Sequence, residues 1–273
     1  MMPTSGVPDP VISCRNLLKS YYPSWFRVGQ AKHVLREIDL AVYEGECVAL
    51  LGESGSGKST LGRQLMGFES PSAGQVLYRG RPLQHLDARA RKDFRCNVQM
   101  VFQDSVAAVN PRFRIGRIIE EPLRHLSNLS EDARRERVAE LLQMVHLQPQ
   151  DADKLPMQMS GGQLQRVCIA RALAPGPRLV ILDEAVSSLD LTLQIQILDL
   201  LSDLRKTLGV AYLFITHDLR LVRRFCDRLV VLGEGRLVEE VQVPAQGVIE
   251  LEHPISRGLQ NAILPARPTQ TAA

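Results

Sequence analysis

The sequence predicts an α/β protein built on a parallel sheet. Four short apolar runs read as buried strands, because each ends abruptly at a glycine or a polar residue. These runs occupy residues 48–51, 179–182, 211–215 and 229–232. Between the runs, apolar residues recur with helical spacing, most clearly from Leu193 to Leu208. A glycine-rich stretch follows the first run, so the order there is strand, tight loop, helix. Strands that alternate with helices favour a parallel sheet with helices on its faces.

The composition argues against two classes of protein, dedicated nucleic-acid-binding proteins and membrane-spanning proteins. The chain has 273 residues, with 33 Lys and Arg against 30 Asp and Glu, which leaves a net charge of +3. This near-balance argues against a dedicated nucleic-acid-binding protein, which normally carries a basic excess. The longest apolar runs fall well short of the roughly 20 residues needed to cross a bilayer. We therefore expect a folded chain that does not itself span a membrane.

The middle of the chain lacks a strand pattern and predicts a helical insertion. Ser130 begins one helix there, with Val138, Leu141 and Leu142 on its apolar side. We expect a single domain over residues 11–264, with a core formed by 11–104 and 165–242 and a helical subdomain at about 105–164. The proline-containing tail, residues 243–273, is expected to be a loosely structured C-terminal extension.

Residues 52–59 read GESGSGKS and fit the phosphate-loop pattern G-x-x-x-x-G-K-[ST]. Glycines let consecutive backbone N–H groups turn toward phosphate oxygens, and the following helix directs its positive end at the anion. Lys58 is expected to reach the β- and γ-phosphates, and the Ser59 hydroxyl to bind Mg²⁺. The candidate nucleotide-binding residues here are Gly52, Glu53, Ser54, Gly55, Ser56, Gly57, Lys58, Ser59 and Thr60.

A second part of the site is predicted where the apolar run at 179–182 ends. Asp183 follows it directly, and a Mg²⁺ ion beside a bound nucleotide needs such a hard oxygen ligand. Glu184 comes next and is the candidate to polarise the water that attacks the γ-phosphate. Together the two motifs predict nucleotide hydrolysis.

Residues 159–163, MSGGQ, closely resemble the LSGGQ signature of ATP-binding-cassette proteins, with Met159 in place of leucine. The signature lies after a phosphate loop and before an Asp-Glu strand end, which is the order found in that family. The resemblance implies a phosphate-loop NTPase with a RecA-like parallel sheet core and an inserted helical subdomain. It also implies that two subunits pack head to tail. The signature of one, here Ser160, Gly161, Gly162 and Gln163, then covers ATP held by the phosphate loop of the other.

Four further positions match family motifs, and their roles are implied by the resemblance. Gln103 matches the glutamine that contacts Mg²⁺ and the attacking water, and Asp190 belongs to the short loop that links the two sites of the dimer. His217 matches the histidine that holds the γ-phosphate. Tyr21 matches the aromatic residue that stacks on adenine, with Tyr22 as the competing candidate. The resemblance makes Glu184, His217 and Lys58 the catalytic candidates, and Ser59, Gln103 and Asp183 the Mg²⁺ ligands.

Two segments point to one group within the family. Residues 103–112 resemble the QD…NPR segment of the peptide and nickel importer ATPases, and His253–Arg257, HPISR, resembles their HPYTR element. Residues 183–190, DEAVSSLD, are similar to the second ATP-binding subunit of nickel importers. The resemblance thus implies an ATP-hydrolysing subunit of a nickel importer, with a peptide or opine importer as the alternative. The six histidines are dispersed, so we expect no nickel site in this chain.

The same resemblance implies the cofactors, partners and location. ATP and Mg²⁺ are the expected cofactors. The expected partners are a second ATPase subunit, in a heterodimer, two transmembrane permease subunits and a periplasmic nickel-binding protein, with no nucleic acid. The chain would be peripheral on the cytoplasmic face of the inner membrane. Two rivals fit less well: a cassette ATPase acting on DNA or ribosomes normally has two cassettes or a coiled-coil insertion, and a small-molecule kinase has no use for the signature.

Overall fold

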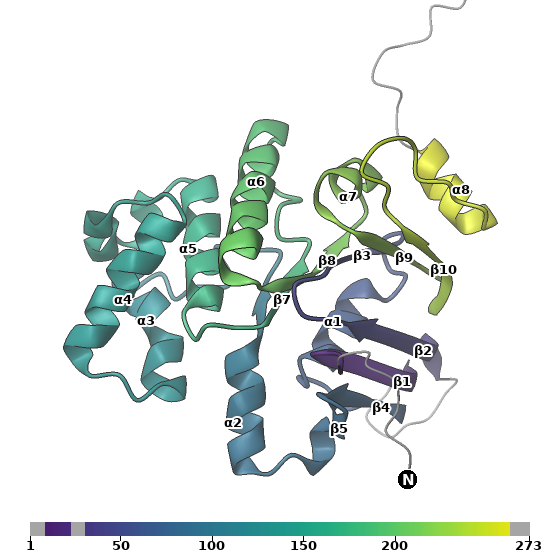
Figure 1. Ribbon diagram of the computed structural model, residues 1–273, viewed down its shortest axis with the longest axis horizontal. Coiled ribbons are helices and arrows are strands. Elements are labelled where there is room, and N and C mark those ends of the chain that lie inside the picture. Colours follow the sequence, from purple (N-terminus) through teal and green to yellow (C-terminus); the bar gives the residue numbers. More distant parts are fainter. Residues whose placement is uncertain (1–8, 23–30, 263–273) are drawn as a thin grey trace, which may run out of the picture.

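The computed structural model describes residues 9–22 and 31–262, which fold into two lobes (Figure 1). The larger lobe contains a six-stranded sheet in the order β10-β9-β3-β8-β7-β6. Its parallel strands are β3 (Cys47–Leu51), β6 (Val98–Val101), β7 (Leu179–Asp183), β8 (Ala211–Thr216) and β9 (Arg228–Gly233). β10 (Arg236–Gln242) pairs antiparallel with β9. The parallel sheet predicted from the apolar runs is therefore present, and each run lies within a strand.

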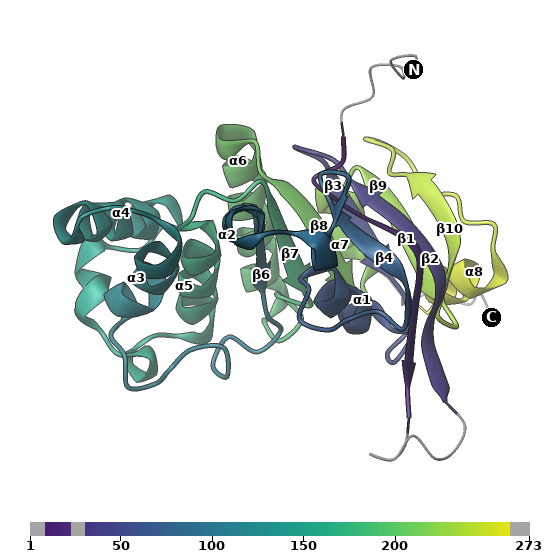
Figure 2. The same cartoon turned by 90° about the horizontal axis from the view of Figure 1, so that it is seen from below.

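The strands β3, β7, β8 and β9 are buried on both faces, which explains why they read as continuous apolar runs. In β3, Val48 and Leu50 face a hydrophobic cluster that includes α1 (Lys58–Leu65). Cys47, Ala49 and Leu51 face the opposite cluster, which includes α6 (Leu191–Leu208) and α7 (Leu219–Phe225). The sheet is thus the middle layer between two cores (Figures 1 and 2).

A second, antiparallel sheet covers the α1 side, and the apolar runs did not predict it. Its order is β2-β1-β4-β5, formed by β1 (Ile12–Tyr21), β2 (Lys32–Val42), β4 (Ala73–Tyr78) and β5 (Arg81–Pro82). The β1–β2 register shifts three times between Cys14 and Ser20. Charged residues interrupt both strands because one face is exposed. Such broken, half-exposed strands give a much weaker sequence signal than buried ones.

The smaller lobe contains α3 (Ile115–Leu126), α4 (Glu131–Met144), the short 3-10 helices η2 (Pro149–Asp153) and η3 (Pro156–Gln158), and α5 (Gly161–Leu173) (Figure 2). Ser130 caps α4, since its hydroxyl accepts the N–H of Ala133 at 3.3 Å. Val138, Leu141 and Leu142 are buried, as the helical pattern predicted. The boundary expected near 164 falls inside α5, which packs against both α3 and β6. α2 (Ala88–Asn97) and η1 (Leu83–His85) complete the connection from β5 to β6.

Helix α6 begins and ends where its sequence dictates. The Asp190 side chain accepts the N–H of Leu193 at 3.0 Å, and Gly209 ends the helix with a φ of 68°. Ile197 and Leu201 are buried, but Leu208, which the apolar spacing also placed on the inner face, is 41% exposed. Leu208 is the last helical residue and lies beyond the core that covers the rest of that face. No helix among residues 9–22 and 31–262 is both long and apolar enough to cross a bilayer.

The prediction of a loosely structured tail is wrong for residues 243–262, the part of the tail that the structure describes. Ile249 and Leu251 are buried in the main core, and α8 (Pro254–Asn261) packs on the end of β9 (Figure 1). A Cβ on Gly233 would lie 2.7 Å from the Ile255 side chain, so the glycine makes room for this helix. The carboxylate of Glu239 holds the segment before α8 by accepting the N–H groups of Glu252, at 2.6 Å, and His253, at 3.4 Å.

We predict that Glu239→Gln lowers the free energy of unfolding by about 1 kcal/mol at neutral pH, because one amide oxygen replaces two carboxylate acceptors. Burial raises the pKa of Glu239, but the hydrogen bonds that the carboxylate accepts, from Glu252 first and from His253 among the others, outweigh it and hold the pKa below its ordinary value of 4.5. A carboxylate whose pKa is lowered by folding stabilises the folded protein at neutral pH. This stabilisation is lost as the pH falls below the pKa of the group in the unfolded chain and then through its pKa in the folded protein.

Urea unfolding at neutral pH and at about pH 4 should therefore show the gap between wild type and Glu239→Gln closing in acid. Glu252→Gln, which removes an exposed carboxylate from the same segment, is the control and should leave stability unchanged at both pH values. A gap that is the same at both pH values would contradict the assigned role of Glu239.

Candidate functional site

The predicted site residues lie at one edge of the parallel sheet. The phosphate loop follows β3, Gln103 follows β6 closely, Glu184 follows β7 and His217 follows β8. Carboxyl ends of parallel strands meet at the same edge, which is where open α/β sheets bind ligands. The pairing of Leu51 with Thr216 and of Asp183 with Ile215 fixes these strand ends side by side. The fold thus gathers residues that lie more than 150 positions apart in the sequence.

The loop at 52–57 forms a cradle suited to phosphate oxygens. Gly57 has a φ of 110°, and no side chain caps α1, which leaves N–H groups of its first turn available to a ligand. The Ser56 hydroxyl is buried and has no hydrogen-bond partner among the described residues. An uncapped helix end and an unpartnered hydroxyl are the features expected where an anion binds.

Lys58 lies across this loop. Its Nζ donates to the carbonyl oxygens of Gly52 and Glu53, both at 2.8 Å, and the residue is only 4% exposed. Burial lowers the pKa of the ammonium group, and the nearby carboxylates of Glu184 and Asp183 partly oppose this effect. Two loop carbonyls are weaker partners for a buried cation than phosphate oxygens would be.

Gly52 leaves no space for a side chain. A Cβ at this position would lie 2.4 Å from the carbonyl oxygen of Leu232 and 2.8 Å from the Ser56 hydroxyl. The end of β9 therefore supports the phosphate loop from below. The sequence motif requires the glycine but does not reveal that Leu232 is the reason.

Ser59 and Asp183 meet as predicted for two ligands of one cation. The Ser59 hydroxyl donates to Asp183 Oδ1 at 2.9 Å, and Asp183 is 8% exposed. Burial raises the pKa of Asp183, while the hydrogen bond from Ser59 opposes that rise. The two groups offer hard oxygen atoms side by side, the donor type that Mg²⁺ prefers.

Glu184 brings two other candidates together. Gln103 Nε2 donates to Glu184 Oε2 at 3.2 Å, and His217 Nδ1 lies 3.9 Å from the same oxygen. Glu184 has a φ of 47°, in the left-handed region, and its own N–H donates to the Ile215 carbonyl at 3.0 Å. A non-glycine residue held in this region stores strain, which is typical of functional positions.

The two aromatic candidates for base binding lie at the end of β1. The Tyr21 hydroxyl donates to Glu69 Oε2 at 2.5 Å, and the residue is 37% exposed. Tyr22 is 47% exposed. Glu69 was not found from the sequence, because nothing in the local pattern after α1 indicates that it meets β1.

The signature residues form a separate group on the helical lobe. Ser160 caps α5 in a capping box with Gln163, whose Oε1 accepts the Ser160 N–H at 2.9 Å. A Cβ on Gly161 would meet nothing within 4 Å, whereas one on Gly162 would lie 3.2 Å from Leu193. Because Asp190 caps the turn that contains Leu193, Asp190 and the signature are neighbours. Figures 1 and 2 place α5 and α1 in different lobes, so the structure divides the predicted residues into two groups.

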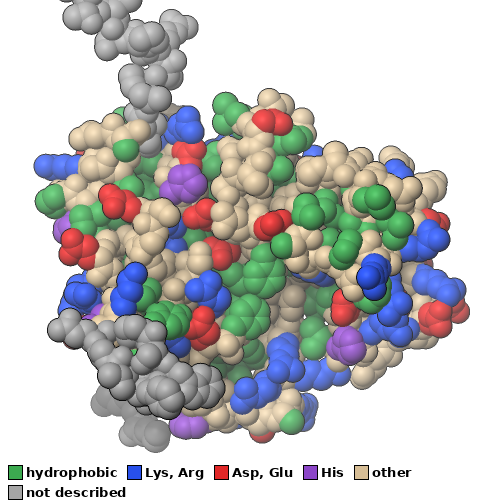
Figure 3. Space-filling model, turned by 180° about the vertical axis from the view of Figure 1, so that it is seen from behind, with side chains coloured by type: hydrophobic (Ala, Val, Ile, Leu, Met, Phe, Trp, Pro, Cys, Tyr) green, Lys and Arg blue, Asp and Glu red, His purple; other side chains and the backbone are tan. Residues whose placement is uncertain are grey.

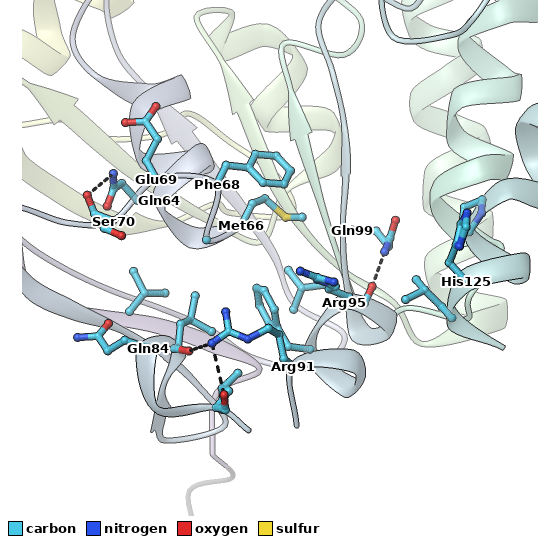
Figure 4. Close-up of a pocket in the computed structure, with 18 of the residues that line it drawn as sticks. Gln64, Met66, Phe68, Glu69, Ser70, Gln84, Arg91, Arg95, Gln99 and His125 are labelled. Atoms are coloured by element: carbon cyan, nitrogen blue, oxygen red, sulfur yellow. Dashed lines mark hydrogen bonds between the residues drawn. The ribbon is translucent and has the colours of Figure 1, made fainter. Parts of the chain in front are cut away.

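A groove of about 590 Å³ opens between the lobes, and the sequence did not predict it. Met66 and Phe68 project into it, and Arg95 and His125 line its other sides (Figure 4). Hydrophobic side chains gather near the centre of the back face of the molecule, with Lys and Arg side chains below them (Figure 3). Phe68 is 55% exposed and stacks on Phe102, with ring centroids 6.3 Å apart. Phe102 directly precedes Gln103, so the groove adjoins the candidate site.

Comparison with known proteins agrees with this geometry. Residues 35–187 match the family model for ABC transporters. The chain is 60% identical over 261 residues to the nickel import ATP-binding protein NikE of Rhodospirillum rubrum, which covers 95% of this chain and 94% of that protein. It is 52% identical over 262 residues to the protein of the same name from Brucella suis biovar 1, covering 95% and 97%.

Among solved structures, a dimeric ATP-binding cassette in a post-hydrolysis state, bound to ADP and Pi, superimposes with a TM-score of 0.75. That structure is 31% identical, and the match covers 85% of this chain and 99% of the other. The chain belongs to the ABC transporter family and has the fold of its ATP-binding cassettes. The family and the fold predicted from the sequence are therefore confirmed, and with them ATP binding and hydrolysis.

We predict that Gly52→Ala weakens ATP binding by about tenfold or more, because the loop must move away from the Leu232 carbonyl and then loses one or more hydrogen bonds to the charged phosphates. Equilibrium binding of ATP with Mg²⁺ to the full chain measures the effect. Gly258→Ala in α8 is the control, since a Cβ there meets nothing within 4 Å, and it should bind ATP as wild type does. Wild-type ATP affinity in Gly52→Ala would show that the loop tolerates a side chain at this position.

Proposed function

We propose that this chain is the ATP-hydrolysing subunit of a membrane importer complex that takes up nickel ions. The observation that carries the proposal is 60% identity, over nearly the whole of both chains, to a protein named for nickel import. The geometry of the site supports the ATPase part independently. A phosphate cradle, a pair of hard oxygen ligands and a strained carboxylate lie at one sheet edge.

The proposed reaction is attack of water on the γ-phosphorus of ATP, with cleavage of its bond to the bridging oxygen to give ADP and phosphate. Glu184 accepts the proton of the attacking water. Gln103 and His217, both beside Glu184 Oε2, orient that water and hold the γ-phosphate. Lys58 exchanges the carbonyls of Gly52 and Glu53 for phosphate oxygens and stabilises the developing charge.

The oxygen donors around Asp183 fit a Mg²⁺ ion. Ser59 and Asp183 would hold it, because the Ser59 hydroxyl oxygen and Asp183 Oδ1 already lie 2.9 Å apart. Gln103 is the third proposed ligand. When bound, the ion neutralises charge on the β- and γ-phosphate oxygens. The raised pKa of Asp183 is consistent with a carboxylate that a cation would stabilise in its charged form.

A second ATPase subunit is the proposed partner across the nucleotide. Ser160, Gly161, Gly162 and Gln163 present an exposed helix N-terminus on the helical lobe, away from the phosphate loop of the same chain. Such an end suits the γ-phosphate of ATP held by another subunit. Asp190 accepts the N–H of Leu193, whose side chain lies against Gly162 of the signature. We propose that Asp190 contacts the facing nucleotide site of the dimer. We expect a heterodimer with a related ATPase.

Two transmembrane permease subunits are the other proposed partners, and the groove is the proposed contact surface. Its apolar floor, formed by residues such as Met66, Phe68 and Phe94, suits the apolar face of a short helix. The basic side chains of Arg91 and Arg95 suit acidic residues at the ends of that helix. The Phe68–Phe102 stack lies between the groove and Gln103, so a bound helix would press on the catalytic segment.

We further propose that the chain lies peripherally on the cytoplasmic face of the inner membrane, and that a periplasmic nickel-binding protein delivers the cargo. Nickel would pass through the permeases without touching this chain. Within residues 9–22 and 31–262, no three His, Cys, Asp or Glu side chains are grouped so as to hold a metal ion.

We predict that Glu184→Gln lowers ATP turnover of the assembled complex by about 1,000-fold or more, because the amide cannot accept the proton of the attacking water. ATP-bound dimers should persist, since the phosphate loop and signature are intact. Phosphate release and size-exclusion chromatography measure the two effects. Glu140→Gln, on the exposed face of α4, is the control and should hydrolyse ATP as wild type does. Unchanged hydrolysis in Glu184→Gln would exclude Glu184 as the base.

We predict that deleting this gene abolishes the activity of a nickel-dependent enzyme in cells grown in low nickel, and that excess nickel restores it. The reason is that uptake from a dilute medium against a concentration gradient needs an energy source, which this subunit would supply by hydrolysing ATP. The measurement is enzyme activity together with cellular nickel content. A deletion that leaves both unchanged but impairs growth on peptides would favour the peptide importer instead.

Variants of the gene, returned to the deletion strain, test the ATP site and the proposed permease contact separately. Lys58→Ala should fail to restore nickel uptake but should still copurify with the permeases. Phe68→Glu should lose copurification, because it places a charge in the apolar groove. Met157→Glu, which alters an 84% exposed residue of η3, is the matched control and should restore uptake. Full copurification of Phe68→Glu would exclude the groove as the permease contact.

A further inference from the structure

Glu69 collects three donors from two elements that flank the ATP site. Its carboxylate accepts the hydroxyl of Tyr21 at 2.5 Å and the Arg63 Nε–H at 3.0 Å, and it pairs with Lys19 Nζ at 3.1 Å. Tyr21 and Lys19 belong to β1, whereas Arg63 belongs to α1. Glu69 is a lining residue of the groove, yet its carboxylate points away from Met66 and Phe68 (Figure 4). Neither the catalytic scheme nor permease docking uses this cluster.

The cluster is charged at neutral pH. Burial raises the pKa of Glu69, but hydrogen bonds from Tyr21, Lys19 and Arg63 outweigh that effect and lower it. The carboxylate side chain is 26% exposed, so its interactions are partly shielded from solvent. A hydrogen bond from a phenol to an ionised carboxylate is among the stronger kinds in proteins.

The consequence for Tyr21 is a fixed ring. An exposed tyrosine at a strand end would otherwise sample several rotamers. Here the hydroxyl is tied to Glu69, and Lys19 Nζ lies 5.0 Å from the ring centroid, which restrains the ring at two points. A ring already fixed in place loses less entropy when a flat ligand stacks on it.

The same carboxylate is linked to the phosphate side of the site. Arg63, held by Glu69, also donates to the Thr60 hydroxyl at 3.3 Å. Thr60 lies in the first turn after the phosphate loop. Glu69 therefore anchors the Tyr21 ring to α1 by side-chain contacts, and none of these contacts uses an N–H group of the phosphate loop.

We propose that Glu69 is a positioning residue for ATP, which holds the Tyr21 ring ready to stack on the base. The proposal rests on the proposed role of Tyr21 in binding adenine. It specifies that Glu69 acts through the base and not through the phosphates. Inorganic tripolyphosphate, which has the phosphates but no base, is therefore the discriminating probe.

The test measures binding of ATP and of tripolyphosphate, each with Mg²⁺, to the full chain. Glu69→Ala should weaken ATP binding about tenfold, within the range that base–aromatic stacking supplies, and tripolyphosphate binding less than about twofold. Tyr21→Phe keeps the ring but loses the link, so it should match Glu69→Ala. The double variant should be no weaker than either single one, because both remove the same interaction. Glu69→Gln keeps an acceptor and should stay within about threefold of wild type.

Glu120→Ala is the matched control. It removes a carboxylate that is similarly shielded, 17% exposed, and paired with Arg134 at 2.6 Å in the helical lobe. It should lower the melting temperature as Glu69→Ala does, without changing ATP affinity. If Glu69→Ala does not fold, Tyr21→Phe carries the same comparison of the two ligands, and Glu69→Gln remains the variant expected to bind both nearly as wild type does.

The outcomes separate this inference from the proposed function. Equal weakening of ATP and tripolyphosphate, or additive effects of the two single variants, would overturn the positioning role. If Tyr21→Ala binds ATP with wild-type affinity, Tyr21 does not stack on the base, and this inference is overturned. The assignment of the chain as an ATPase would not be affected. A wild-type chain that binds neither ligand would instead overturn the proposed site.

Discussion

The parallel pairing of β3, β8, β7 and β6 is the constraint on which the rest of the structure depends. It sets the phosphate loop, His217, Asp183 with Glu184, and Gln103 at one edge of the sheet. Side chains alternate between the two faces of a strand, so a register shift of one residue would exchange the inward and outward positions. The pairing of Asp183 with Ile215 therefore decides that Asp183 meets Ser59 and that Glu184 turns toward Gln103.

This edge keeps charged groups partly buried without full compensation. Burial lowers the pKa of Lys58 and raises that of Asp183, so both groups are less stable in their charged forms than in water. Their present partners are loop carbonyls and one hydroxyl. Phosphates and a cation would provide stronger partners, so binding energy is available at the position proposed for the reaction. The left-handed backbone of Glu184 adds a local strain that the surrounding β7 and β8 hold in place.

The turn that follows α1 serves two surfaces at once. Phe68 projects into the groove between the lobes and stacks on the residue before Gln103. Glu69, its neighbour, holds Tyr21 and Arg63 on the nucleotide side. Two adjacent side chains thus connect the proposed permease contact with the residue proposed to stack on the base of ATP.

Features encoded by contiguous residues were determined by the sequence itself. The phosphate loop at 52–59, the signature at 159–163 and the helix start at Ser130 depend on local backbone conformation, which a few neighbouring residues specify. Four of the five parallel strands were equally visible, because a strand covered on both faces must be apolar throughout. The fifth, β6, was not predicted, since Gln99 interrupts its short apolar run. These local signals sufficed for the fold class and for the family.

The tertiary structure alone decided the contacts between distant segments. The antiparallel sheet, the packing of α8 on Gly233 and the exposure of Leu208 depend on what lies opposite each residue, which local spacing does not record. The hydrogen bond between Tyr21 and Glu69 joins residues 48 positions apart, and the support of Gly52 comes from a backbone carbonyl that carries no side-chain signal. Motifs encode the chemistry of the site locally, whereas the residues that hold it in position are chosen by the packing of the whole chain.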